Sequence, residues 1–413
     1  MKILYINNFA NLRGGSDRMF IETANAMAEE KNEVAVFYSS NDSNATKNEN
    51  LNSKIKQFIT FDFFSSNKNI LLKTLKFIKN TTAQNDLQKV IDTFKPDIIH
   101  LHIFQSRLSS SIIQTIKKNK IKSVMTIHEY KILCPVYTHL DMNINICEKC
   151  KPFNYTPCIK NKCVEGNLFK STLMSLESLN RDIFYSYIKN IDLFLMVSNF
   201  IQQKHEKVYS NYSFKFKQLY NFVEVRENNS NLNYGDYLLY FGRLSKEKGI
   251  DILLDAIKLN KNIPLKIVGT GDQLEHIQQR IINENMSNVE LLGFKSGDEL
   301  NEIIKKSRFT IVPSSWFENN PMNIIESFSF GKPVIASNIG GIPELVNNNT
   351  GFLFESKNHE ELSEIINKSW EIETNQYEKM SINCYNYAKH NFSKKIHMQK
   401  LILYYKELTL KTL

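Results

Sequence analysis

The segment Phe309–Phe328, which reads FTIVPSSWFENNPMNIIESF, decides the fold. It begins with a short apolar run, 309–314, that does not alternate with polar residues, as in a strand covered by helices on both faces. A polar loop follows, and Pro321 then stands where a helix would begin, because the first helical turn makes no use of the amide hydrogen that proline lacks. The segment therefore predicts a strand, a loop and a helix in succession.

The same succession recurs along the chain. The other strand candidates are short apolar runs that end in polar turns: 2–7, 33–40, 97–102, 123–128, 192–198, 237–242, 265–269, 289–293, 333–337 and 351–355. Strand–helix alternation over this length predicts an α/β protein with two doubly wound parallel sheets. Apolar residues give way to Asn and Glu at 225–235, where we expect the linker between two domains.

Composition narrows the class of protein. With 413 residues, 42% of them hydrophobic and 23% charged, the chain can bury real cores, which excludes a disordered or low-complexity protein. Lys and Arg number 52 against 43 Asp and Glu, and the net charge of +9 favours anionic partners. No apolar run is long enough to span a membrane, and the amino terminus turns polar too early for a signal peptide. We therefore expect a cytoplasmic protein.

Loops at the carboxyl ends of strands are the places where parallel sheets bind ligands. Gly14 and Gly15 lie between a strand and a helix, where backbone amides can approach an anion, and a simple loop with a helix cap fits them equally well. Around Gly269, the sequence Val268–Asp272 superficially looks like a dinucleotide fingerprint. Leu274 occupies the third glycine position, however, which favours a tight turn and weakens a dehydrogenase interpretation.

Two further loops carry charged residues. Arg243 and Lys248 leave one strand end within a single loop, as in a phosphate-binding site, although loop cations are usually solvated. Glu318 precedes the helix that begins near Pro321, and Glu326 falls in an early turn of that helix. A carboxylate suits a sugar because it can accept two hydrogen bonds from a diol. A capping acid and an ordinary helix-surface residue would give the same sequence pattern.

Taken together, these segments resemble glycosyltransferase family 4, retaining enzymes with the GT-B architecture, in which two Rossmann-like domains face each other across a cleft. Glu318 and Glu326 match the family's Glu-x7-Glu pattern. The other matching motifs stand on strand ends in the family's order: Gly242-Arg243…Lys248-Gly249, Leu292-Gly293-Phe294, Gly331-Lys332-Pro333-Val334-Ile335-Ala336 and Gly340-Gly341-Ile342-Pro343-Glu344. The resemblance spans nearly the whole chain.

The resemblance implies a division into domains. Residues 1–224 would form an acceptor-binding Rossmann-like domain, 225–235 the linker, and 236–392 a nucleotide-sugar-binding Rossmann-like domain. Residues 393–413, which carry apolar residues at helical spacing, would form a C-terminal helix that crosses back onto the first domain.

The resemblance also implies roles at a donor site. Arg243 and Lys248 would neutralise the diphosphate of a nucleotide-sugar as the glycosidic bond breaks. Glu318 would bind hydroxyls of the donor sugar, and Glu326 would hold the ribose diol. The other donor-binding candidates are the amides near Met322 and Asn323, Gly14 and Gly15 approaching the phosphates from the other domain, Gly269, and Phe294 near the base.

The resemblance places His128 on the acceptor side of the donor sugar, although a core or loop histidine would fit the sequence as well. His128 lies in Thr126-Ile127-His128-Glu129-Tyr130, and this motif, with His100-Leu101-His102, looks like a subgroup of the family that acts in cell-envelope glycan assembly. We expect His100 and His102 to lie on opposite faces of one strand, so that at most one of them points toward the ligands.

That subgroup often carries a cysteine-rich insert, which here would be 134–163. Four cysteines in it are spaced as Cys147-x2-Cys150-x7-Cys158-x4-Cys163. Four sulfurs would complete a tetrahedral structural zinc site, and unliganded thiols fit the spacing equally well. We expect no catalytic role for these cysteines.

The implied function is retaining transfer of a hexosyl group from a UDP- or GDP-sugar to a glycan or lipid-linked acceptor in cell-surface polysaccharide assembly. We expect catalysis to need no metal, because no Asp-rich motif stands beside the phosphate site. The basic amphipathic segment 69–80 would either rest on an anionic inner membrane or pack on its own domain. The alternatives are a nucleotide-sugar epimerase of the same architecture and a zinc- or nucleic-acid-binding protein; we expect no nucleic-acid partner.

Overall fold

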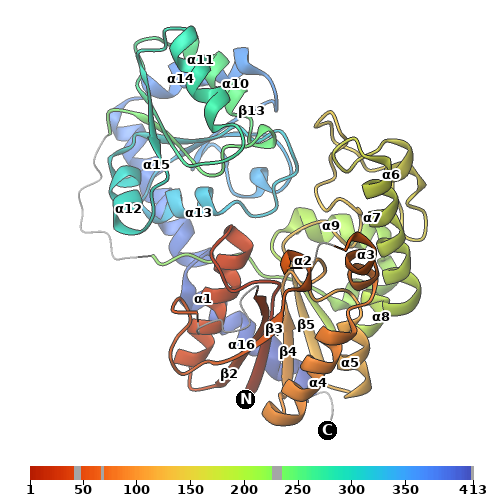
Figure 1. Ribbon diagram of the computed structural model, residues 1–413. Helices are drawn as coiled ribbons and strands as arrows, with labels where there is room; N and C mark the ends of the chain where they lie inside the picture. The colour runs from red at the N-terminus through yellow and green to blue at the C-terminus, as the bar shows by residue number, and fades with distance from the viewer. Residues whose placement is uncertain (41–47, 67–68, 226–234, 411–413) are drawn as a thin grey trace. The chain divides into compact units, whose positions relative to one another are not determined.

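The computed structural model describes residues 1–40, 48–66, 69–225 and 235–410 (Figure 1). The chain divides into two compact units. The first comprises Met1–Asn143, Cys147–Leu219 and Met398–Leu413, and the second comprises Ile144–Ile146 and Tyr220–His397. Most of the predicted linker, at 226–234, lies outside the described residues.

The first unit is built on a seven-stranded sheet with all neighbouring strands parallel, in the order β3-β2-β1-β4-β5-β6-β7. The strands are β1 (Lys2–Ile6), β2 (Glu33–Ser40), β3 (Lys56–Phe61), β4 (Ile98–Leu101), β5 (Lys122–Ile127), β6 (Leu193–Met196) and β7 (Phe216–Gln218). The sequence did not predict β3 and β7, the two edge strands. β3 is only partly buried and mixes polar with apolar residues, so it lacks the continuous apolar run of a covered strand.

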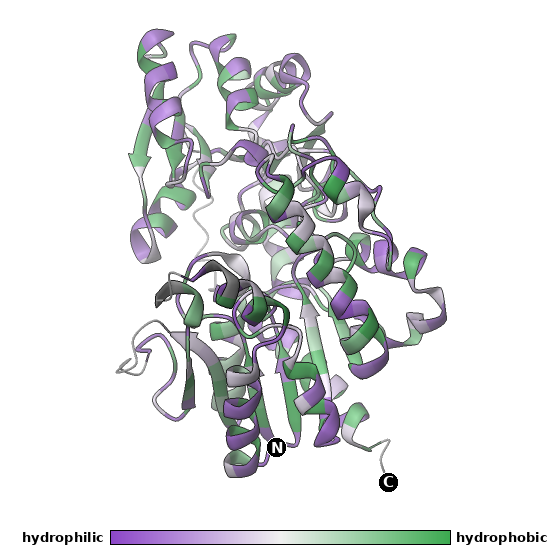
Figure 2. Cartoon of the chain, turned by 45° about the vertical axis from the view of Figure 1, so that its right-hand side comes forward, coloured by the Kyte–Doolittle hydropathy of each residue, from purple (hydrophilic) through white to green (hydrophobic). Residues whose placement is uncertain are grey.

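Helices of the first unit pack against this sheet or against one another, and most strand ribbon in Figure 2 has the green of hydrophobic residues. They are α1 (Gly15–Glu29), α2 (Phe63–Ser66), α3 (Ile70–Ile78), α4 (Thr81–Phe94), α5 (Ile112–Lys118), α6 (Thr156–Lys160), α7 (Leu168–Asn180), α8 (Tyr187–Asn190) and α9 (Asn199–Val208). The C-terminal helix α16 (Lys394–Leu410) adds Met398, Leu401 and Tyr405 to the same core. The prediction that this helix returns to the first domain is confirmed.

The second unit is built on a six-stranded parallel sheet in the order β10-β9-β8-β11-β12-β13. Its strands are β8 (Leu238–Phe241), β9 (Leu265–Val268), β10 (Val289–Gly293), β11 (Phe309–Val312), β12 (Val334–Ser337) and β13 (Gly351–Phe354). Its helices are α10 (Ile250–Lys258), α11 (Leu274–Asn283), α12 (Gly297–Lys306), α13 (Met322–Ser329), α14 (His359–Trp370) and α15 (Thr374–Asn391). Two Rossmann-like sheets were predicted, and both are present.

Each sheet has one point at which the order of strand addition reverses. In the first sheet this switch lies between β1 and β4, and in the second between β8 and β11. The loops that follow two such strands diverge, which leaves a crevice at the carboxyl end of the sheet where α/β proteins bind ligands. The loops after β1, β4, β8 and β11 are therefore the expected ligand-binding loops. Within the described ranges, no helix has both the length and the apolarity that a membrane span requires.

Candidate functional site

At the switch point of the second sheet, an ion pair joins the loop after β8 to the loop after β11. Lys248 Nζ lies 2.6 Å from Glu318 Oε1, and Ser314 Oγ donates a hydrogen bond to the same oxygen at 2.7 Å. Burial alone would raise the pKa of Glu318, but the Lys248 ammonium and these hydrogen bonds outweigh burial and hold the pKa below its usual value. Glu318 is therefore an ionised carboxylate that is almost fully buried.

Arg243 lies in the same loop as Lys248 but has different partners. Its guanidinium donates to Glu247 Oε1 at 2.6 Å and to Ser245 Oγ at 3.2 Å, and its side chain is 61% exposed. An exposed ion pair of this kind contributes little to stability. Arg243 can therefore exchange Glu247 for a ligand at low cost, whereas Lys248 is held in place by a buried partner.

The amino terminus of α13 lies at the same switch point. The helix begins at Met322 with Pro321 as its N-cap, so the predicted start is confirmed. Asn323 Nδ2 donates to the carbonyl oxygen of Phe241, the last residue of β8, at 3.3 Å. The amides of Met322 and Asn323 belong to the first helical turn, where N–H groups lack partners within the helix and favour an anion. Glu326 lies half-buried one turn further along α13.

Two glycines after β12 fix the backbone on which Glu318 sits. Gly341 N donates to Glu318 O at 2.6 Å. A Cβ atom on Gly340 would lie 2.4 Å from Glu318 O, and one on Gly341 would lie 2.0 Å from Asn319 O. Only glycine allows these backbones to approach so closely. Sequence reasoning used this glycine pair as a family motif but did not assign it this supporting role.

Gly269 plays a similar packing role after β9. Its φ is +148°, and a Cβ atom there would lie 1.9 Å from Gly242 O, so the turn after β9 packs directly against the turn after β8. The interpretation of this segment as a tight turn thus agrees with its position. Phe294 follows the edge strand β10 and is 70% exposed, two strands away from β8.

At the switch point of the first sheet, polar side chains bind the loops together. Asn7 follows β1; its Oδ1 accepts from Ile103 N at 2.9 Å, and its Nδ2 donates to Asp17 Oδ1 at 2.8 Å. Gly14 is the N-cap residue of α1, and a Cβ atom on it would meet nothing within 4 Å. Among the described residues, no neighbouring group therefore requires glycine at this position for packing, in contrast to Gly269.

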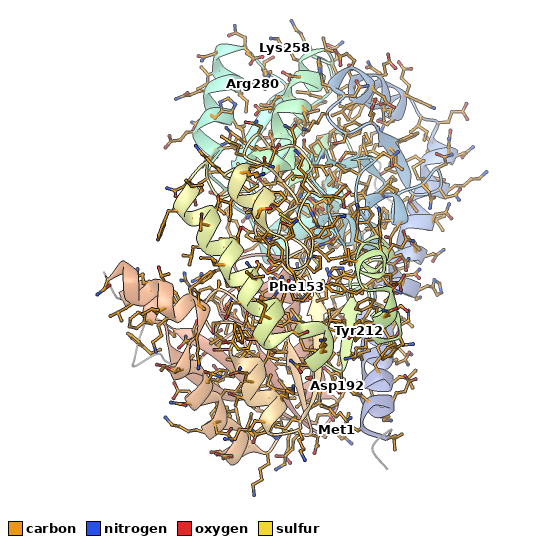
Figure 3. The ribbon with its side chains drawn as sticks, turned by 90° about the vertical axis from the view of Figure 1, so that its right-hand side faces the viewer. Met1, Phe153, Asp192, Tyr212, Lys258 and Arg280 are labelled. Atoms are coloured by element: carbon orange, nitrogen blue, oxygen red, sulfur yellow. The ribbon has the colours of Figure 1, made fainter. Side chains whose placement is uncertain are left out.

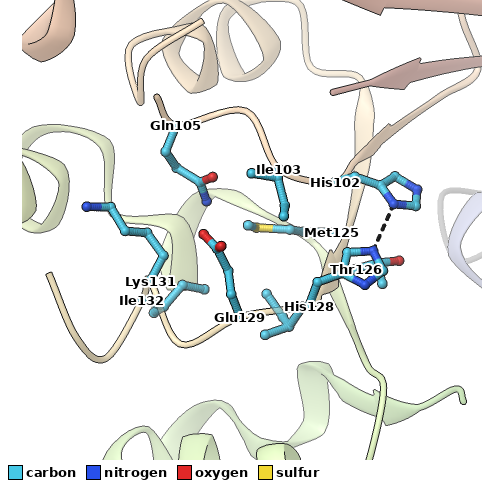
Figure 4. Close-up of a pocket in the computed structure, with 10 residues that line it drawn as sticks. His102, Ile103, Gln105, Met125, Thr126, His128, Glu129, Lys131 and Ile132 are labelled. Carbon is cyan, nitrogen blue, oxygen red and sulfur yellow. Dashed lines mark hydrogen bonds between the residues drawn. The ribbon is translucent and has the colours of Figure 1, made fainter. Parts of the chain in front are cut away.

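A row of three histidine rings crosses β4 and β5. His102 Nδ1 and His128 Nε2 are 3.0 Å apart, with the rings stacked at 5.2 Å (Figure 4). The rings of His100 and His102 are 4.7 Å apart, so the expectation that they lie on opposite faces is wrong. Residues two positions apart in an extended chain point to the same side. His100 is instead bound in the core, 2.7 Å from Thr126 Oγ1 and 2.5 Å from Tyr405 OH.

A small pocket beside this row contains Glu129, which sequence reasoning did not single out. Figure 4 shows Glu129, Gln105 and Lys131 around it. Burial raises the pKa of Glu129 to about 7; Lys131 opposes this shift, and Asp17 adds to it. The available signal was its position, one residue after His128 at the carboxyl end of a strand. Glu129 can therefore exchange a proton near neutral pH.

The predicted zinc ligands are free cysteines. Cys158 is buried, and Cys147, Cys150 and Cys163 are half-buried. A hydrogen bond from Cys163 is the main cause that lowers the pKa of Cys158 to about 7. In the part of the chain that the structure describes, no group of three or more His, Cys, Asp or Glu is arranged to hold a metal ion. The structural zinc stays a prediction that this geometry does not support.

Comparison with known proteins gives two family matches. Residues 13–227 match the model of Glycosyltransferase Family 4, and residues 224–391 match that of Glycosyl transferases group 1. An uncharacterized glycosyltransferase of Methanocaldococcus jannaschii is 33% identical over 198 residues, 47% of this chain and 54% of that protein. The lipopolysaccharide 1,2-N-acetylglucosaminetransferase of Salmonella typhimurium is 35% identical over 122 residues, 26% of this chain and 32% of the enzyme.

Among solved structures, Anabaena HepE in complex with UDP matches with a TM-score of 0.67 and 18% identity, over 100% of both chains. That similarity shows the fold alone. The match spans little more than half of the Methanocaldococcus relative and 64% of a Klebsiella pneumoniae protein of the cps region. The family models together run from the first glycine-rich loop to the end of α15, and the chain belongs to glycosyltransferase family 4.

Proposed function

We propose that the protein transfers a sugar from a UDP- or GDP-sugar to a glycan or lipid-linked acceptor and retains the configuration at the anomeric carbon. The observation that carries this proposal is the ion pair of Lys248 with Glu318 at the β8/β11 switch point, beside the first turn of α13. It sets an ammonium, the first-turn amides of α13 and a carboxylate at one switch point. A diphosphate and a sugar need these groups together.

The positive groups act on the leaving diphosphate. As the glycosidic bond breaks, negative charge grows on the phosphate oxygen, and Arg243, Lys248 and the amides of Met322 and Asn323 stabilise it. We assign to Gly14 and Gly15, at the start of α1, the binding of an anionic group through backbone amides. These cations and the helix terminus then supply positive charge at the phosphates without a metal ion.

The carboxylates act on hydroxyl groups. Glu318 is ionised and therefore accepts hydrogen bonds from the donor sugar, while Glu326 accepts them from the ribose diol. The acceptor oxygen attacks the anomeric carbon on the face from which the diphosphate departs. Its proton passes to the departing phosphate oxygen, so no enzyme nucleophile is required. His128, in the first unit, acts on the acceptor side of the reaction.

The activities of related proteins support the proposal. One relative is a lipopolysaccharide N-acetylglucosaminetransferase, and a protein of the same fold binds UDP. By analogy, we place the reaction in cell-surface polysaccharide assembly at an anionic inner membrane face, where a lipid-linked acceptor would lie.

The test combines ligand binding with product analysis. A nucleoside diphosphate that binds only the folded state raises the melting temperature, so we expect either UDP or GDP to do so at millimolar concentration. Arg243→Ala combined with Lys248→Ala should reduce turnover sharply, and Lys266→Ala, on the second strand of the same unit, serves as the control. Mass spectrometry with and without acceptor separates transfer from epimerisation. No shift with any nucleotide, or an altered sugar nucleotide formed without acceptor, would refute the proposal.

A further inference from the structure

The helical run formed by α7 and the π-helical segment η1 (Arg181–Tyr185) has its polarity reversed with respect to solvent. The side chains on its inner face are buried to at least 97%: Ser171, Ser175, Glu177, Ser178 and Arg181. The outer face carries large apolar side chains that are 50–64% exposed: Leu168, Phe169, Leu176, Ile183 and Phe184. A helix on a water-facing surface normally shows the opposite arrangement.

Buried charges hold the helix in this orientation. Glu177 accepts a hydrogen bond from Ser110 Oγ at 2.7 Å, and its other oxygen lies 3.1 Å from Lys131 Nζ. Arg181 donates to the carbonyl oxygens of Lys131 and Ile132 at 2.5 and 3.2 Å. Rotating the apolar face inward would break these interactions and leave charges buried without partners, which is costly. The outward apolar face is therefore a fixed property of the fold.

Neighbouring segments extend the apolar surface. Helix α3 packs along α7, and Asn180 Nδ2 donates to Ile78 O at 3.4 Å where the two helices end. Leu72 and Leu75 of α3 are exposed. Phe153 N donates to Asp182 Oδ2 at 3.1 Å, so the exposed residue Phe153, which is labelled in Figure 3, lies beside η1. We call the following set the apolar patch: Leu72, Leu75, Phe153, Leu168, Phe169, Leu176, Ile183 and Phe184.

The segments that carry the apolar patch are basic. Residues 63–85 contain four lysines and no acidic residue. In 149–190, the acids are Glu165, Glu177 and Asp182; the last two face inward in ion pairs, and Glu165 pairs with Lys170. Lysines remain exposed around the patch: Lys79, Lys149, Lys151, Lys160, Lys162 and Lys189. Exposed apolar side chains among unopposed lysines match an anionic lipid surface in both polarity and charge.

We propose that the apolar patch docks the first unit on an anionic lipid bilayer. The leucine and phenylalanine side chains enter the headgroup region, and the surrounding lysines bind lipid phosphates. A second copy of the chain fits less well, because a symmetric contact through the patch would bring the lysines of both copies together. This inference extends the proposed function by naming the surface on which a lipid-linked acceptor is met. Its biological meaning rests on that proposed function.

The inner face of the same helix connects this surface to the first-unit site. Lys131 and Ile132, whose carbonyls accept from Arg181, lie three and four residues after His128 in the loop that follows β5. The helix therefore contacts the loop of His128 on one side and offers the apolar patch on the other. Docking through α7 would bring that loop close to the headgroups, where a lipid-linked acceptor presents its sugar.

The test is co-sedimentation of the full chain with vesicles of phosphatidylcholine alone or mixed with phosphatidylglycerol. We expect binding to the anionic vesicles that weakens with salt. Phe169→Ser combined with Phe184→Ser should weaken it at least about tenfold, since two exposed aromatic anchors are lost. Lys79→Gln, Lys151→Gln and Lys160→Gln should each weaken it about fivefold. The matched control is Phe214→Ser with Ile282→Ser, which removes two apolar side chains outside the patch that are at least as exposed.

Melting temperature and nucleotide binding are measured on every variant, so a folding defect is not mistaken for lost docking. Wild-type protein that does not sediment with anionic vesicles, or a control pair that loses as much binding as the patch pair, overturns the inference. If the wild type is a dimer and the patch pair Phe169→Ser with Phe184→Ser is a monomer, the patch binds a second copy of the chain and the inference is overturned. Because vesicle binding needs no donor, it can succeed or fail independently of the nucleotide test of the proposed function.

Discussion

Replacing Lys248 by methionine tests whether the Lys248–Glu318 ion pair is the central element of the second-unit site. Methionine keeps most of the apolar stem but removes the ammonium 2.6 Å from Glu318 Oε1. Of the polar contacts described above, only the hydrogen bond from Ser314 would then support the carboxylate. The variant therefore leaves a buried charge without its counter-ion.

The size of the effect follows from burial. The side chain of Glu318 is 7% exposed and that of Lys248 is 21% exposed. Removing one partner of a buried pair costs about 3–5 kcal/mol, and we take the low end, about 3 kcal/mol, because water reaches Lys248. For a unit of this size, that loss corresponds to a fall in melting temperature of roughly 6–12 °C at pH 7.5.

The pH dependence gives a second readout. In the wild type the pKa of Glu318 is lowered, so its stabilising contribution exists above the unfolded carboxyl pKa and disappears as pH falls through the folded value. In Lys248→Met, burial is no longer opposed by the ammonium and raises the pKa. The variant therefore loses stability as pH rises. The difference between the two proteins should be largest near pH 8 and shrink toward pH 4.5.

The control is Lys258→Met, which removes a half-exposed lysine 2.9 Å from Glu284 and should cost less than about 1 kcal/mol at every pH. Adding Glu318→Gln to Lys248→Met should restore part of the lost stability, because the buried charge is gone. Equal melting temperatures for Lys248→Met and Lys258→Met across pH 4.5–8 would refute the reasoning.

Three further substitutions probe the remaining contacts. Gly340→Ala would place a Cβ atom 2.4 Å from Glu318 O. The control Gly297→Ala has a similar positive φ, but its Cβ atom would meet none of the described residues within 4 Å. Only Gly340→Ala should therefore weaken nucleotide-sugar binding in a calorimetric titration, by about tenfold or more. Burial raises the pKa of Glu129 to about 7, so its stabilising contribution is present at low pH and lost as pH rises through that value. Relative to Glu129→Gln, the wild type should lose about 1–3 kcal/mol between pH 5 and 8 in urea unfolding, and parallel pH curves would contradict this. His102→Phe keeps a ring stacked on His128 but removes the hydrogen bond between the two side chains. We expect kcat to fall about tenfold, while KM and nucleotide binding stay nearly unchanged. A change in KM alone would show that His102 acts only through packing.

The sequence predicted best where one local rule decides the structure. Continuous apolar runs marked the covered strands, and Pro321 marked the start of α13. The order of such elements also predicted two parallel sheets, and with them the strand ends that carry Arg243, Lys248 and Glu318. Edge strands such as β3 were not predicted, because a partly exposed strand needs no continuous apolar run.

Contacts between distant segments could not be predicted. Nothing local shows that Lys248 pairs with Glu318, seventy residues away, or that Glu129 lies in a pocket that raises its pKa. The expectation for His100 and His102 failed for a different reason. Their spacing already places both side chains on one side of the chain, and the structure brings their rings together.

The reversed polarity of α7 shows a further limit of sequence periodicity. A stripe of apolar residues every three or four positions predicts an amphipathic helix, but the period is the same whether the stripe faces the core or the solvent. In 168–185, the choice is made by Glu177 and Arg181, whose partner Lys131 and its carbonyl lie about fifty residues earlier in the chain. A buried ion pair is a weak source of stability but a strong determinant of orientation, because every other rotation leaves a charge without its partner. The contacts of Glu177 and Arg181 with Lys131 hold the loop after His128 in place. The same contacts therefore also fix the rotation of α7 that turns the apolar patch outward.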